Sequence, residues 1–234
     1  MAVPVVKFPI LMRLIRLLGV LVTALVLTWT VHYRGGLALV SANKDLIFNA
    51  HPVLMVIGLV LVNGEGNYPF SALLALLVCE FICIGEEMTN QENEQKRVND
   101  YKMNDFVLSW RSLIGFWAAL KFHNDKGIDN LYSLHSWLGL ACLFLFSIQE
   151  VQETAGPPCF HGMCFSGVYI YALSVATATT GILEKVTFLQ TNNVISRYST
   201  EALLVNSLGI LMIVLGGFVV SCISYFSEEQ RRHP

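Results

Sequence analysis

The stretches FNAHPVLMVIGLVLVNGE, residues 48–65, and SLHSWLGLACLFLF, residues 133–146, decide the fold of this chain. Each places a histidine after a few polar residues and then continues as a long aliphatic or aromatic run. Such a run is typical of a membrane-crossing helix, which needs about 20 mostly apolar residues. His51 and His135 therefore occupy equivalent positions. We expect both in the first turn of a span, where Pro52 is also tolerated.

The composition of the whole chain agrees with a membrane protein. Hydrophobic residues make up 54% of its 234 residues and charged residues 14%, against about 45–50% and about 25% in average soluble proteins. Five or six spans would use about 100–120 apolar residues, which leaves little for a water-soluble core. The formal net charge of −2 excludes the basic surplus that nucleic-acid binding requires. We expect an integral, multi-pass protein that contacts membrane lipid and no nucleic acid.

Apolar runs on either side of the two stretches predict the other spans. The six-span arrangement uses residues 14–31, 46–62, 106–120, 131–148, 163–183 and 202–226, with a polar loop over 121–130 and both termini in the cytosol. Nine of the 15 Lys and Arg residues then lie on the cytosolic side, in agreement with the positive-inside rule. The predicted fold is an all-α membrane bundle of six spans.

Residues 69–85 leave a second topology open. This run is apolar enough for a short span but contains Glu80, and residues 86–105 after it are strongly polar. If the run crosses the membrane, the chain has seven spans and everything after it inverts. His51 and His135 would then lie near opposite faces, whereas six spans bring them to the same depth near the non-cytosolic face.

Two histidines at one depth, on helices of the same direction, predict a pair of axial ligands for haem iron. Imidazole is a common haem ligand, and an ionisable residue inside a span is a functional candidate by default. With both axial positions filled, iron has no open site for O₂, which favours one-electron transfer. The alternative is that each histidine only hydrogen-bonds a carbonyl near a helix end. The six cysteines lie mostly in or beside apolar runs and are interpreted as small core residues.

Four segments closely resemble the cytochrome b561 family, especially its plant members. They are residues 48–65, SLIGFWAALKFHNDKGIDNLYSLHSWLGLACLFLF from residue 112, YIYALSVATATTGILEKVTFLQ from residue 169, and ISRYSTEALLVNSLGI from residue 195. The resemblance implies a homodimer of six-helix bundles in which four central helices hold two b-type haems, one near each face. It implies electron transfer from cytosolic ascorbate to monodehydroascorbate or a ferric chelate across the membrane. It also makes a vacuolar or other endomembrane location the expected one.

The resemblance assigns roles to residues around the non-cytosolic haem. The axial ligands would be His51 and His135, further haem contacts Asn130, Leu131, Tyr132, Ser133 and Glu184, and the outer substrate surface Phe122 and His123.

The cytosolic haem lacks its family ligands in this chain. Counting from the matching segments, Tyr101 stands where the family has one histidine and Met163 where it has the other, with His161 two residues away. His161 and Met163 are the remaining candidates for a second haem. One haem is therefore expected where the family has two, and about half of a roughly 30 Å hydrocarbon core would have no cofactor.

Two further clusters have simpler interpretations. Cys159, His161 and Cys164 offer three zinc ligands in a short loop, but they lack the second half of a structural zinc site. The basic side chains between residues 96 and 102 loosely replace a basic ascorbate site, although such a run is more typical of a solvated surface.

The sequence thus predicts one b561-type membrane domain over residues 1–226, with a divergent insertion at 67–105 and a cytosolic tail at 227–234. Its predicted function is that of an oxidoreductase of the ascorbate-dependent ferrireductase type, which transfers electrons across the membrane through b-type haem. The alternative is a non-catalytic or single-haem protein of the same fold, defective in that transfer. A further interpretation is that residues 67–105 and 149–162 derive from a misread exon, because the family pattern stops and resumes abruptly there.

Overall fold

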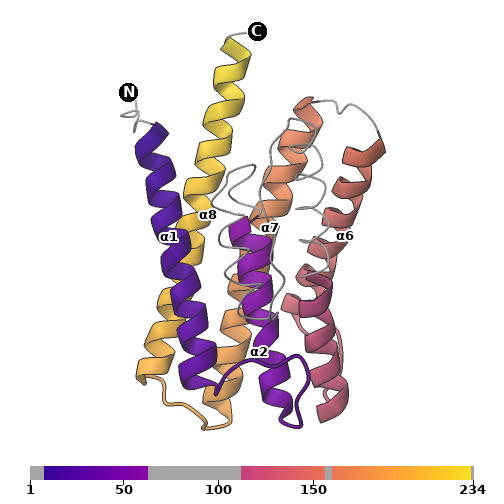
Figure 1. Ribbon diagram of the computed structural model, residues 1–234, viewed down its shortest axis with the longest axis vertical. Helices are drawn as coiled ribbons and strands as arrows, with labels where there is room; N and C mark the ends of the chain where they lie inside the picture. Colours follow the sequence, from indigo (N-terminus) through magenta and orange to yellow (C-terminus); the bar gives the residue numbers. More distant parts are fainter. Residues whose placement is uncertain (1–7, 63–111, 156–159, 233–234) are drawn as a thin grey trace, which may run out of the picture.

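The computed structural model describes residues 8–62, 112–155 and 160–232. All regular secondary structure in these ranges is helical, which confirms the predicted all-α class. A helix over residues 112–126 completes a single bundle (Figure 1), whose other helices are α1 (Phe8–Thr28), α2 (Lys44–Met55), α6 (Leu134–Ala155), α7 (Phe160–Thr191) and α8 (Thr200–Arg232).

Neighbouring helices of the bundle run antiparallel. α8 packs against α1 and α7, and α7 packs against α6. In Figure 1, α1 and α7 descend from the end that carries both termini, whereas α2, α6 and α8 rise toward it. α2 and α6 therefore share one direction, as the six-span arrangement predicts and the seven-span arrangement does not. Residues 69–85, on which the two arrangements differ, lie outside the described residues.

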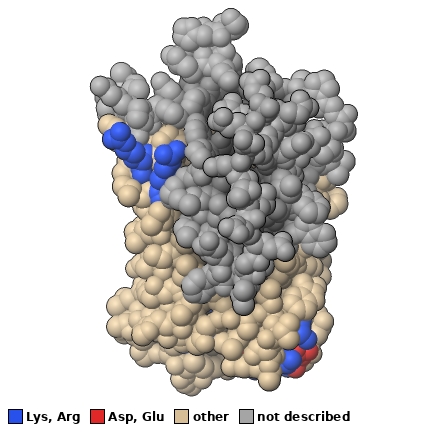
Figure 2. All heavy atoms as spheres, viewed as in Figure 1, with Lys and Arg blue, Asp and Glu red and all other residues tan. Residues whose placement is uncertain are grey.

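Three of the described helices are long and apolar enough to cross a membrane: Ile10–Tyr33, Ser166–Thr191 and Thr200–Ile223. Leu134–Gln149 in α6 is a shorter apolar helix. On the face drawn in Figure 2, the charged side chains of the described part gather near the two ends of the bundle, and the surface between them is uncharged. The chain is a membrane protein.

The prediction that His51 and Pro52 lie in the first turn of their span is wrong. α2 begins at Lys44, because the side chain of Asn43 accepts a hydrogen bond of 3.1 Å from the backbone N–H of Asp45 and caps the helix there. Polar residues before the apolar run are therefore helical. His51 lies two turns inside α2, whereas His135 lies in the first turn of α6, as predicted.

Pro52 stands inside α2, and the winding of the chain changes one turn after it. Proline has no N–H to donate to the carbonyl four residues earlier, so the α-helical hydrogen bonds are interrupted at this point. The chain then continues as a π-helix, η2 (Val56–Val62). A second π-helix, η1 (Trp29–Tyr33), continues α1 at the opposite end of the bundle from the N-terminus. π-helical segments often occur next to functional sites.

The predicted polar loop over residues 121–130 is helical as far as residue 126. Lys121 and Asp125 form an i,i+4 ion pair of 3.1 Å, which favours the helix. The helix ends at Gly127, whose φ of +67° suits glycine, and the N–H of Ile128 donates to the carbonyl of His123 at 2.9 Å. This is the hydrogen-bond pattern of a glycine-terminated helix.

The largest hydrophobic core lies between α1, α7, α8 and η2. Val22, Val26, Val205, Leu208 and Met212 have no exposed surface there. A smaller cluster joins α2 to the helix over residues 112–126 and contains Ile47, Ala50, Leu54 and Ala118. Cys142 and Cys222 are buried and free, which confirms the interpretation as core residues for these two cysteines. Side-chain burial of the other four lies outside the described part.

A buried polar contact ties the end of α1 to the start of α8. Glu201 is 5% exposed, and one of its oxygens accepts a hydrogen bond of 2.9 Å from the indole N–H of Trp29. Its other oxygen pairs with the guanidinium of Arg34. The carboxylate therefore joins helices that meet at the end of the bundle opposite the termini.

Candidate functional site

A cavity of about 250 Å³ lies between α2, the helix over residues 112–126, α6 and α7. Its lining is mostly apolar and aromatic. The polar groups that line it include His51, His123, His135, Glu184 and Lys185. A mostly apolar cavity with a few convergent polar groups is the usual form of a cofactor or ligand site.

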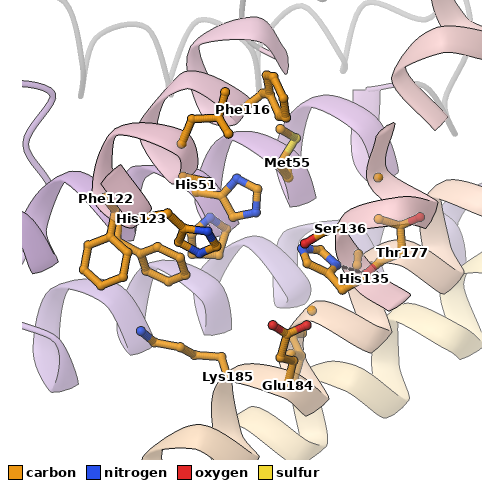
Figure 3. Close-up of a pocket in the computed structure, with 18 of the residues that line it drawn as sticks. His51, Met55, Phe116, Phe122, His123, His135, Ser136, Thr177, Glu184 and Lys185 are labelled. Atoms are coloured by element: carbon orange, nitrogen blue, oxygen red, sulfur yellow. Dashed lines mark hydrogen bonds between the residues drawn. The ribbon is translucent and has the colours of Figure 1, made fainter. Parts of the chain in front are cut away.

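His51 and His135 lie next to each other at the centre of this cavity (Figure 3), one from α2 and one from α6. Their ring centres are 5.9 Å apart, and the ring planes are inclined at 79°. The structure thus brings together the two histidines that the sequence paired. A metal bonded at roughly 2 Å to one nitrogen of each imidazole separates the ring centres by roughly 6 Å.

Both imidazoles are oriented by backbone carbonyls of the facing helix. Nδ1 of His51 lies 2.9 Å from the carbonyl oxygen of Gly115, and Nδ1 of His135 lies 2.9 Å from that of Thr177. Because a carbonyl oxygen only accepts, each Nδ1 carries the proton and donates it. The lone pair of each Nε2 is therefore left for a metal. Metal-binding histidines are typically oriented by a hydrogen bond of this kind from the second ring nitrogen.

Glycines make the close approach of both imidazoles possible. A Cβ added at Gly181 would lie 2.6 Å from Cε1 of His135, so this position of α7 admits only glycine while the ring stays in place. A Cβ at Gly115 would lie 3.1 Å from Cε of Met55 and 3.3 Å from Cβ of Leu54. Gly115 thus lets its helix approach α2, which brings its carbonyl within reach of His51. The residues present fit a bis-histidine haem in their donor atoms, their spacing and the apolar lining.

Tyr132 and Glu184 form a polar contact at the edge of the cavity. The hydroxyl of Tyr132 donates to an oxygen of Glu184 at 3.1 Å. Partial burial, together with the neighbouring carboxylate, raises the pKa of Tyr132. The phenol therefore stays protonated at neutral pH and remains a donor, which fixes Glu184 against the loop that precedes α6.

The structure places most of the other predicted site residues on the same cavity. Asn130, Leu131, Phe122 and His123 all line it. Phe122 and His123 have ring centres 6.1 Å apart, and those of His123 and Tyr132 are 6.4 Å apart. Ser133 does not line the cavity. Its hydroxyl accepts a hydrogen bond from the backbone N–H of Ser136 at 3.3 Å and caps α6 instead.

The candidates for a second haem lie apart from this site. His161 and Met163 belong to the first turn of α7, at the end of the bundle that carries the termini, and their side chains lie outside the described part. Tyr101 and the basic residues between 96 and 102 lie outside the described residues, as does Cys159. Among the described side chains, no group of three or more potential metal ligands is present.

Sequence reasoning missed three residues that shape the cavity. Lys185 follows Glu184 on α7 and lines the same cavity, and Gly181 and Gly115 give the histidines their room. A lysine near the end of an apolar span is a signal that sequence alone offers. The glycines gave no signal, since their role depends on which helices face each other.

Comparisons with known proteins place this chain in a family. A family model described as eukaryotic cytochrome b561 matches residues 86–155. The likeness therefore extends into residues 86–105, which we treated as divergent from sequence alone.

Individual relatives match this chain over most of its length. Transmembrane ascorbate ferrireductase 2 of Arabidopsis thaliana is 54% identical over 233 residues, which cover 94% of this chain and 93% of that protein. Ascorbate-specific transmembrane electron transporter 2 of Zea mays is 36% identical over 218 residues, with 87% and 84% covered. Probable ascorbate-specific transmembrane electron transporter 1 of Oryza sativa subsp. japonica is 35% identical over 214 residues, with 87% and 84% covered. The chain belongs to the cytochrome b561 family.

Proposed function

We propose that this protein transfers electrons across a membrane from ascorbate through b-type haem bound between His51 and His135. The relatives are named as ascorbate ferrireductases or ascorbate-specific electron transporters, and the family is one of b-type cytochromes. The observation that carries the proposal is the pair of imidazoles with ring centres 5.9 Å apart and both Nδ1 atoms held by backbone carbonyls.

The residues of this chain prepare the site for a one-electron reaction. The carbonyls of Gly115 and Thr177 accept hydrogen bonds from Nδ1 of the two imidazoles, so the lone pair of each Nε2 stays available. Haem held there by His51 and His135 would supply a one-electron couple. Aromatic and aliphatic side chains from four segments line the cavity and exclude water, which limits side reactions.

The acceptor is expected at the end of the bundle away from the termini. Phe122, His123 and Tyr132 lie at the part of the cavity nearest the loop over residues 127–133. Their aromatic rings and the Tyr132 hydroxyl offer stacking and hydrogen-bond contacts. We propose monodehydroascorbate or a ferric chelate as the acceptor at this non-cytosolic face.

We propose one haem per chain, because Tyr101 and Met163 stand where the family has the histidines of the second haem. The resemblance to plant members supports a homodimer embedded in lipid and a vacuolar or other endomembrane location. The N-terminus and residues 227–234 would lie in the cytosol, where ascorbate donates its electron. Exposed apolar side chains such as Leu17, Phe144 and Ile210 would face the lipid.

One purification tests the proposal directly. The full chain, purified in detergent from cells supplied with a haem precursor, should give a reduced-minus-oxidised spectrum of a b-type cytochrome on addition of ascorbate. His51→Ala and His135→Ala should abolish that spectrum, because each removes one axial nitrogen. His32→Ala is the matched control, since His32 packs on Tyr33 away from the cavity. A wild-type protein without haem would overturn the proposal, and full haem content in both alanine variants would move the ligands elsewhere.

A further inference from the structure

Lys185 is a lysine in the wall of the cavity. It belongs to the span Ser166–Thr191 and is half-buried. Lys44, Lys121 and Lys126 each have a carboxylate oxygen within 3.6 Å. In the ranges that the structure describes, no carboxylate lies within 4.0 Å of Lys185. The adjacent Glu184 is hydrogen-bonded to Tyr132 instead.

Aromatic rings from three segments hold the ammonium group of Lys185. Its Nζ lies 4.0 Å from the ring centre of Phe48 on α2, 5.5 Å from that of Phe122 and 6.0 Å from that of Phe188. Phe48 and Phe122 also pack on each other, with ring centres 4.8 Å apart. Cation–π contacts of this kind offset part of the cost of removing an ammonium group from water. They also restrict the position of the ammonium group, since two of the rings come from helices that face α7 and the third comes from α7 itself.

Lys185 lines the same cavity as the histidine pair. Figure 3 shows Lys185 and Glu184 extending from α7 on one side of His51 and His135, with Met55 and Phe116 on the other side. A charge at membrane depth normally has a partner or a function. The rings supply only a weak partner, so an anionic group in the cavity would complete the electrostatics of the site.

We propose that Lys185 binds a carboxylate inside the cavity, and that Phe48 and Phe122 hold its ammonium group in position for this. The inference rests on the proposed function, since two carboxylates are available there. One source is a propionate of the bound haem, and the other is a carboxylate of an anionic electron acceptor. Both offer the same chemistry to Nζ, namely charge-assisted hydrogen bonds from a compact ammonium group.

The two sources have different consequences for Lys185→Met, which keeps the length of the side chain and removes the charge. If the partner is a propionate, the midpoint potential of the haem becomes more negative, because a positive charge near the haem favours the reduced form. A tenfold change in the reduction equilibrium corresponds to about 59 mV for one electron. If the partner is the electron acceptor, the midpoint potential of the haem is unchanged. The KM for a negatively charged ferric chelate such as ferric citrate then rises about tenfold.

Three further variants separate these outcomes from misfolding. Lys185→Arg keeps the charge and should restore the wild-type value in either case. Phe48→Leu keeps the charge of Lys185 but removes the nearest ring. It should shift the same quantity as Lys185→Met, either the midpoint potential or the KM, in the same direction and by a smaller amount. Lys126→Met removes a lysine that also contacts the Phe122 ring, at 5.7 Å, but that pairs with Asp45 and does not line the cavity. It should leave both quantities unchanged.

The experiment is a redox titration of each purified, haem-loaded variant, followed by kinetics with ferric citrate and with an uncharged ferric chelate. A more negative potential in Lys185→Met alone supports the propionate, and a higher KM confined to ferric citrate supports the acceptor. Unchanged potential and unchanged KM in Lys185→Met overturn the inference. A wild-type protein that binds haem but is not reduced by ascorbate overturns the proposed function instead, so the two failures are distinguishable.

Discussion

The imidazole of His135 is the side chain whose surroundings leave it the least freedom. Its Nδ1 is bonded to the carbonyl of Thr177, and its ring rests against the backbone of Gly181, one turn further along α7. A histidine ligand oriented in this way presents a single nitrogen to the metal without reorganisation. The position of the imidazole ring and the glycine at residue 181 therefore depend on each other, because a side chain at residue 181 would displace the ring.

Gly181→Ala should weaken haem binding about 10–100-fold, the usual effect of disturbing the orientation of a ligand. The new Cβ would lie 2.6 Å from Cε1 of His135 and must displace the ring. Haem retained per chain after dilution into haem-free detergent buffer measures the effect. Gly217→Ala in α8 is the control, because a Cβ there meets nothing within 4 Å. Equal haem retention in the two variants would contradict the close contact at His135.

At the scale of single residues, the sequence predicts the ligand pair but not its support. His51 and His135 share a recognisable context of polar residues followed by an apolar run. The structure places the two rings 5.9 Å apart, although His51 lies two turns inside α2 and not in its first turn. The cap at Asn43 extends that helix through polar residues, and hydrophobicity alone does not detect a cap.

Among the elements, α8 depends on a single buried carboxylate at its first turn. Glu201 accepts a hydrogen bond from Trp29 and pairs with Arg34, so both ends of η1 are joined to α8 through one side chain. Removal of one partner from a buried pair leaves an uncompensated charge. The position of α8 against α1 is therefore sensitive to this residue, although many apolar contacts also hold the two helices together.

Glu201→Gln should lower the free energy of unfolding by about 3 kcal/mol, because it leaves the charge of Arg34 without a partner. The midpoint temperature of haem release on heating measures the loss. Tyr33→Phe is a suitable control at the same junction, since the Tyr33 hydroxyl makes only an exposed contact of 3.3 Å with Thr200. A change for Glu201→Gln no larger than that for Tyr33→Phe would show that the carboxylate is dispensable.

The start of α2 and the end of the helix over residues 112–126 are joined by ion pairs at the surface. Asp125 lies 3.1 Å from Nζ of both Lys121 and Lys44. Hydrogen bonds from Lys121, which has the larger effect, and from Lys44 hold the pKa of Asp125 below its usual value. A carboxyl whose pKa is lower in the folded state stabilises the fold above its unfolded pKa, and this contribution is lost as the pH falls through the folded value.

Asp125→Asn should therefore destabilise the protein at neutral pH but not at strongly acidic pH. The difference in thermal midpoint between wild type and variant should be constant from about pH 5 to pH 7 and shrink below about pH 4, the usual pKa of an aspartate. Asp129→Asn, in the loop that follows, serves as the control. A difference between wild type and Asp125→Asn that persists at pH 2.5 would show that the effect is not electrostatic.

For the whole molecule, the sequence predicts the fold class and the direction of the helices better than it predicts where each helix begins and ends. Three of the predicted spans coincide with described helices that are long and apolar enough to cross a membrane, and the equal direction of α2 and α6 agrees with the six-span count. The helices extend beyond those runs: α7 begins at Phe160 and ends at Thr191, and α8 continues to Arg232. Length of this kind depends on helix-terminating residues such as Gly127 and on solvent beyond the membrane, neither of which a hydrophobic run reveals.

The topology has a direct test in sealed vesicles. Ala42→Cys and Ser196→Cys place exposed thiols in the two connections at the end of the bundle opposite the termini. A membrane-impermeant maleimide should label both from one side, and a protease should remove tags at the N- and C-termini only from the other side. Labelling of the two thiols from different sides would contradict the arrangement. Native-like haem content in each variant confirms that it is folded.

The two atoms that accept hydrogen bonds from the histidine Nδ1 atoms are main-chain oxygens. The absorption of bound haem can therefore report on helix assembly as well as on haem binding. No side-chain substitution deletes the carbonyl of Gly115 or Thr177, so these two hydrogen bonds depend on how the helices are placed relative to one another. Haem absorption would then measure correct assembly of the bundle, because haem binding requires α2, α6, α7 and the helix over residues 112–126 in their correct relative positions. A screen for misassembled variants in a membrane would need only an absorption spectrum.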